Sequence, residues 1–96
     1  MSVVELTINS DNTYSDAVYV SKDFVFSLIS TSFSGIVTVQ RSFESTLVIW
    51  RDVKSFDSTS IEENGVQPGG AWYRFGTKTG EYTSGSIVGR LSAVAL

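Results

Sequence analysis

The residues of this chain that could do acid-base chemistry are a few carboxylates. Asp52, Asp57, Glu62 and Glu63 lie within one short stretch, and two carboxylates facing each other across a sugar are the machinery of a glycosidase. The same acids do not match a calcium-binding loop, because the glycine that such a loop needs for its turn is missing. We interpret them as solvated turn residues and expect neither a catalytic site nor a metal site.

Histidine and cysteine are both absent from the sequence. The chain therefore lacks the commonest general base, thiol nucleophiles and the usual zinc and copper ligands. Gly65, Gly69 and Gly70 do not form a phosphate-binding loop, because no Lys-Ser or Lys-Thr pair follows them. The sequence predicts a protein that is not an enzyme and has no cofactor.

Two tryptophans, Trp50 and Trp72, are candidates for a ligand platform. Flat aromatic rings on a β-sheet suit stacking against a sugar, so a carbohydrate-binding module is one hypothesis. Each tryptophan lies inside an apolar run, however, and large aromatic residues in such runs usually fill the core. We expect core positions and keep the platform as the alternative.

Three arginines, Arg41, Arg74 and Arg90, fall within predicted strands. Their guanidinium groups could stack on aromatic rings such as Trp50 and Trp72, or pair with carboxylates at a subunit interface, where arginine is enriched. Alternatively, their aliphatic stems cover the sheet while their charged ends reach water. Both readings remain open.

Length and charge narrow the range of partners. The chain has 96 residues, enough for one thin core, and its net charge is -3 with seven scattered basic residues. Nucleic acid is therefore not expected as a partner, because binding phosphate needs concentrated positive charge. No apolar run approaches the roughly 18 residues of a membrane-spanning helix, and no secretory signal is visible, so we expect synthesis in the cytoplasm.

The periodicity predicts an all-β chain organised around a hairpin, with one arm at residues 34–43 and the other at 47–53. Other strands are expected at 3–8, 17–20, 23–30, 53–61, 71–75 and 86–91, with loops at 62–70 and 76–85. Short strands separated by turns indicate a single antiparallel β-sandwich of about seven strands over residues 1–96. A small β-barrel is the alternative.

In two of these predicted strands, the alternation of side chains predicts which residues share a face of the strand. In the first, one face carries Val4, Leu6 and Ile8, and the other carries Val3, Glu5 and Thr7. In the weaker strand at 53–61, Val53, Ser55 and Asp57 alternate with Lys54, Phe56 and Ser58. Each set is expected to share one face of its strand.

Four segments together resemble small β-sandwich proteins encoded among the structural genes of tailed phages. They are residues 34–43 (SGIVTVQRSF), 50–53 (WRDV), 70–76 (GAWYRFG) and 80–91 (GEYTSGSIVGRL), and the resemblance covers about residues 24–92. One departure is the turn at residues 44–46, where glutamate, serine and threonine replace the Asp-Gly-Gly type of turn that is usual in such sequences.

The resemblance implies a virion component without enzymatic activity. The leading hypothesis is a capsid decoration (cement) protein that binds the shell as an oligomer, and a head-to-tail or tail component is the alternative. The implied partners are the major capsid protein and copies of the chain itself, with no nucleic acid, membrane or small-molecule substrate.

Residues 1–16 and 92–96 are candidate interaction arms, because their apolar residues lie outside the motifs of the resemblance. The candidate interface residues are Val3, Val4, Leu6, Ile8, Val94 and Leu96, with Arg41, Arg74 and Arg90 as second-rank candidates.

Overall fold

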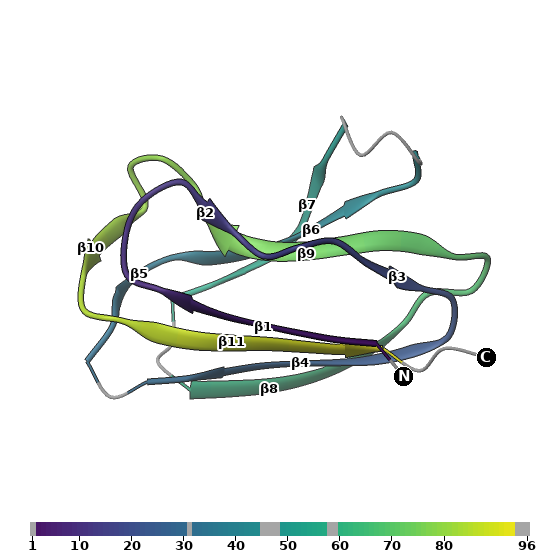
Figure 1. Cartoon of the computed structure of the whole chain (residues 1–96), viewed down its shortest axis with the longest axis horizontal. Coiled ribbons are helices and arrows are strands. Elements are labelled where there is room, and N and C mark those ends of the chain that lie inside the picture. Colours follow the sequence, from purple (N-terminus) through teal and green to yellow (C-terminus); the bar gives the residue numbers. More distant parts are fainter. Residues whose placement is uncertain (1, 31, 45–48, 58–59, 94–96) are drawn as a thin grey trace.

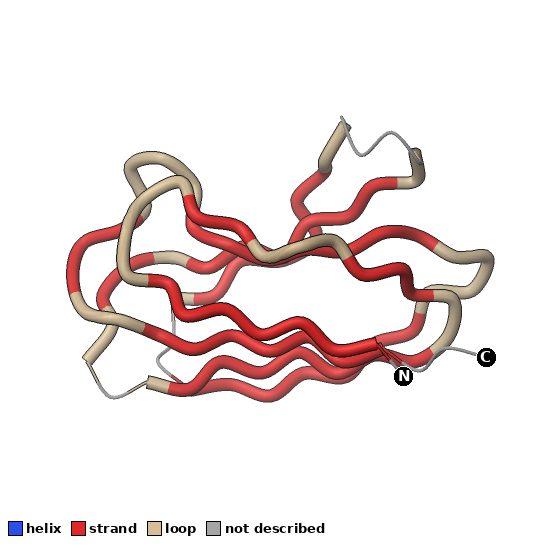
Figure 2. Tube along the Cα trace, viewed as in Figure 1, coloured by secondary structure: helices blue, strands red, loops and turns tan. Residues whose placement is uncertain are grey.

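The computed structural model describes residues 2–30, 32–44, 49–57 and 60–93, and all the regular structure in them is β-strand (Figure 2). Seven strands have six or seven residues, and they are β1 (Ser2–Ile8), β4 (Asp23–Ile29), β6 (Val37–Ser42), β7 (Arg51–Phe56), β8 (Ser60–Val66), β9 (Ala71–Thr77) and β11 (Ile87–Ala93). Four are shorter: β2 (Thr13–Tyr14), β3 (Val18–Val20), β5 (Ser34–Gly35) and β10 (Tyr82–Ser84). Within the described residues no helix is long and apolar enough to cross a membrane.

The strands form two layers that pack face to face (Figure 1). The first sheet has the order β1-β11-β4-β8, and the second has the order β2-β9-β6-β7, with β3 also paired to β9. Every pairing is antiparallel, and β5 pairs with β10 at one end of the molecule. The two sheets do not close into one ring, which confirms the sandwich and excludes the barrel.

Alternating side chains from both sheets fill the core between the layers. Phe26 of the first sheet and Phe75 of the second are buried with their ring centroids 5.1 Å apart. Gly89 in β11 leaves room for this packing, because a Cβ atom there would lie 2.3 Å from the Phe75 ring. In β1 the predicted alternation is confirmed: Ile8 is fully buried and Val4 and Leu6 pack against the core.

The predicted loop at 62–70 is half wrong, because β8 continues to Val66 and only residues 67–70 form a turn. Gly65 misled the prediction. It lies within the strand, and a Cβ atom there would come within 2.4 Å of the Phe24 ring. This glycine therefore marks the close approach of an aromatic ring to the backbone and not a turn.

The hairpin of β6 and β7 is confirmed, but its second arm lies later than predicted. β7 begins at Arg51, and residues 45–48, with the unusual turn, lie outside the described residues. Val39 pairs with Lys54 and Gln40 with Asp52, so Val53 is an extra residue that forms a β-bulge. The predicted alternation fails there: Ser55 bonds Thr38 on the outer face, whereas Val53 lies against the core side.

One side of the sandwich is open. At the other side β1 contacts β3 of the second sheet, but β7 and β8 are both edge strands with one described neighbour each. The hairpin of β6 and β7 also rises away from the two layers at its turn end (Figure 1). The molecule therefore has a projecting hairpin beside an open edge.

Candidate functional site

Both tryptophans lie on the outer face of the second sheet, and the expectation that they fill the core is wrong. Trp72 alternates in β9 with the buried Ala71 and Tyr73, so its side chain points away from the core. It meets Tyr19 edge to face, with ring centroids 5.3 Å apart. The sequence misled us because β9 is apolar on both of its faces.

Arg74 is at the centre of this outer face. Its guanidinium carbon lies 4.2 Å from the centroid of the Tyr14 ring and 4.3 Å from that of Trp50, so the stacking reading of Arg74 is confirmed for Trp50. Desolvation in this position lowers the pKa of Arg74, although arginine keeps its charge at any physiological pH. The cation thus holds two aromatic side chains, one from β2 and one from the residue before β7, against the sheet.

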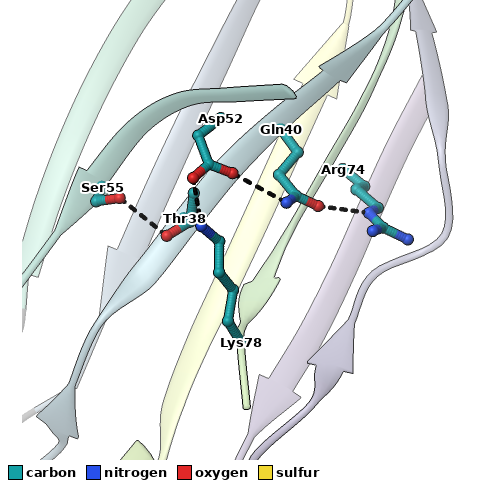
Figure 3. Close-up of polar contacts among 6 residues, drawn as sticks. All are labelled: Thr38, Gln40, Asp52, Ser55, Arg74 and Lys78. Carbon is teal, nitrogen blue, oxygen red and sulfur yellow. Dashed lines mark hydrogen bonds and ion pairs between the residues drawn. The ribbon is translucent and has the colours of Figure 1, made fainter. Parts of the chain in front are cut away.

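A chain of polar contacts runs from Arg74 across the sheet (Figure 3). Arg74 Nε donates to Gln40 Oε1 at 2.8 Å, and Gln40 Nε2 donates to Asp52 Oδ1 at 3.0 Å. The other Asp52 oxygen pairs with Lys78, and Thr38 and Ser55 share a hydrogen bond of 2.9 Å beside them. This outer-face network joins β9, β6 and β7.

The Lys78 ammonium and the amide of Gln40 lower the pKa of Asp52 below its ordinary value of 3.8, and the hydrogen bond to Asp52 raises the pKa of Lys78 above 10.5. The Asp52–Lys78 pair therefore stabilises the fold fully at pH values between the two ordinary pKa values, 3.8 and 10.5. Its contribution is lost as pH falls through the lowered pKa of Asp52 or rises through the raised pKa of Lys78. Because the side chain of Lys78 is about a third exposed to water and that of Asp52 is well over a third exposed, that contribution is at most about 1 kcal/mol.

The acids considered for catalysis and metal binding do not gather. Asp52 lies in the outer-face network of the second sheet, whereas Glu63 of β8 pairs with Lys54 at 2.7 Å and Glu62 is exposed. Across the described part of the chain, no three metal-binding side chains lie close enough together to hold an ion. Asp52 is also a poor general base, because its lowered pKa means that the carboxylate binds a proton weakly.

Arg41 lies on the opposite, inner face of the same sheet, beside a cavity. Its Nη1 donates to Gln67 Oε1 at 3.2 Å, and the Tyr73 hydroxyl donates to the same oxygen at 2.7 Å. The Arg41 guanidinium carbon also lies 5.0 Å from the centroid of the Phe43 ring. Sequence reasoning missed this position, although alternation with Val37 and Val39 could have placed Arg41 on the core face.

The remaining predicted interface residues are scattered. Arg90 is exposed on the outer face of the first sheet, opposite Glu5 on β1, so the three arginines occupy three separate places. Ile8 is fully buried, which contradicts its assignment to an interface, because contact would require opening the core. Val3 is exposed, Val4 and Leu6 are partly buried, and Val94 and Leu96 lie outside the described residues.

Comparison of the chain with protein-family models, with curated proteins and with solved structures found no match. A function for this chain must therefore be inferred from its geometry and from the sequence motifs described above.

Proposed function

We propose that this chain is a non-enzymatic structural protein of a tailed-phage particle, a decoration protein that binds the capsid shell in many copies as an oligomer. Its partners would be the major capsid protein and further copies of itself. Two kinds of support exist: the resemblance of the four sequence segments, and the projecting hairpin of β6 and β7. The hairpin is the observation that carries the proposal.

The hairpin of β6 and β7 exposes apolar side chains to solvent, where they contribute nothing to the core of the monomer. Phe43 is 64% exposed and Ile49 is 50% exposed, and both lie near the turn end of the hairpin. Exposed apolar groups that gather beside charged residues, here Arg41 and Arg51, are typical of contact sites between proteins. Repeated contacts of modest strength add up when many copies bind one shell.

The test is the copy number of this chain in purified particles, measured by quantitative mass spectrometry against the major capsid protein. A decoration protein should be present in hundreds of copies, because it follows the symmetry of the shell. About six or twelve copies, the number expected of a ring, would move the chain to the head-to-tail connection or the tail. Complete absence from particles would refute the proposal.

The same assay tests the role of the hairpin. Particles assembled with the double variant Phe43→Ser and Ile49→Ser should lose most of their bound copies. The matched control is Ile29→Ser, which changes an equally exposed residue (68%) on the first sheet. Equal occupancy by the double variant and the control would exclude the hairpin as the contact site.

A carbohydrate-binding module is a second candidate, because Trp50 and Trp72 lie on a partly exposed sheet face and not in the core. Acrylamide should then quench the tryptophan fluorescence, and an oligosaccharide selected on a glycan array should protect it. Trp72→Ala should abolish binding to the array, because its ring supplies stacking area. Array binding that is equal for the variant and the natural chain, or absent from both, would reject this candidate.

A further inference from the structure

A cavity of about 280 Å³ opens between the edge strands β7 and β8, away from the outer-face network, and Arg41 lies between it and the hairpin tip. Its walls are mostly aromatic and aliphatic side chains, including Phe24, Phe26, Val39, Val53, Phe56 and Tyr73. Cavities of this kind, apolar with a few fixed polar groups, are the usual form of small-molecule sites. Its volume lies just below the usual range of roughly 300–1,000 Å³, so the ligand should be small.

Two local features keep this cavity open. The bulge in β7 puts the consecutive residues Val53 and Lys54 at the cavity, where a regular strand would send one of them to the outer face. Across the gap, the absence of a side chain at Gly65 of β8 lets the Phe24 ring lie against the strand backbone and form part of the cavity wall. The shape of the cavity therefore depends on one local feature in each edge strand.

One positive charge in the cavity wall has no opposing charge. Lys54 and Glu63 neutralise each other, with Nζ and Oε1 2.7 Å apart, but the described ion pairs do not include Arg41. Arg41 bonds the neutral amide of Gln67, and its buried Nε has no hydrogen-bond partner among the described residues. The guanidinium is partly exposed, but its buried Nε has no acceptor in place of water, so an anion beside the group would supply both an acceptor and the missing opposite charge.

We propose that the cavity binds a straight-chain aliphatic carboxylate of medium length, with its alkyl chain among the aromatic rings and its carboxylate paired with Arg41. A guanidinium presents several N–H donors in a plane that suits a carboxylate, and one described hydrogen bond, to Gln67, uses Nη1. At roughly 30 Å³ for a group the size of water, the cavity of about 280 Å³ takes about nine such groups, close to the ten non-hydrogen atoms of octanoate. This inference does not depend on the proposed role in a phage particle.

The experiment is a titration of the isotope-labelled chain with octanoate, followed through backbone amide shifts in NMR spectra. Octanoate should shift amides of β6, β7 and β8, and 1-octanol and octylamine should bind at least tenfold more weakly, because they lack the negative charge. Arg41→Met should weaken octanoate binding at least tenfold, whereas Arg90→Met, on the outer face of the first sheet, should not change it.

A second variant keeps the test valid if Arg41→Met fails to fold. Val53→Phe should fill part of the cavity from an exposed edge position and lower octanoate affinity while the rest of the spectrum stays unchanged. The proposal is overturned if millimolar octanoate shifts no amide around the cavity, if 1-octanol binds equally well, or if Arg41→Met binds like the natural chain. Tighter binding of acetyl-alanyl-leucine than of octanoate would assign the cavity to a polypeptide end and also overturn it.

Discussion

Replacing Phe75 with alanine should lower the free energy of unfolding by about 3–5 kcal/mol, the range for removing a fully buried phenylalanine ring. The Phe75 side chain has no exposed surface, and its ring contacts Phe26 of the opposite sheet and lies against the backbone at Gly89. Both sheets would lose contacts at once. Domains of this size are typically stable by only about 5–15 kcal/mol, so the variant should approach the limit of folding.

Equilibrium denaturation in urea measures this loss. Phe43→Ala is the control, because it removes the same ring from a position that is 64% exposed, and surface changes usually stay within about 0.5 kcal/mol. A loss below about 1 kcal/mol for Phe75→Ala would mean that the two sheets do not pack through this ring, since buried phenylalanines cost several times more.

Replacing Gly85 with alanine should also destabilise the fold strongly, through two separate costs. Gly85 connects β10 to β11 with a φ of +81°, where a side chain is strained by about 1–2 kcal/mol. A Cβ atom there would also lie 2.4 Å from the carbonyl oxygen of Ser32. Because that atom is backbone and cannot rotate away, we expect a further cost of about 1–3 kcal/mol.

Gly80→Ala separates the two costs. Gly80 has nearly the same φ, +86°, but a Cβ atom there would meet nothing within 4 Å. Its replacement should therefore cost only the conformational part, about 1–2 kcal/mol. The difference between the two variants in urea denaturation measures the clash with Ser32, and equal losses would show that the loop moves aside freely.

Much of the fold could be predicted because alternation is a local property. The inward face of β1, the strand at β4 and the hairpin of β6 and β7 all follow from residues next to one another in the sequence. The bulge at Val53 could not be predicted, because it is defined by the register between two strands. Gly65 was misread for the same reason, since the Phe24 ring that covers it belongs to β4.

The candidate sites were harder to predict because they depend on which side of a sheet a residue faces. Trp72 belongs to a strand that is apolar on both faces, so its sequence could not separate core from surface. Gln67 accepts hydrogen bonds from both Arg41 and Tyr73, which lie on two different strands, and no local sequence motif indicates this contact. The three arginines looked alike in the sequence, yet one stacks on aromatic rings, one lines a cavity and one faces solvent.

The bulge also bears on how this chain behaves when it is crowded. An unpaired strand edge is a template on which identical chains can add end to end and grow into aggregates. In β7 the extra residue Val53 interrupts the even row of amides and carbonyls, and in β8 the exposed Glu62 would repel the same residue of a second copy. The irregular edge of β7 and the charge on β8 therefore hinder copies of the chain from polymerising through their open edges.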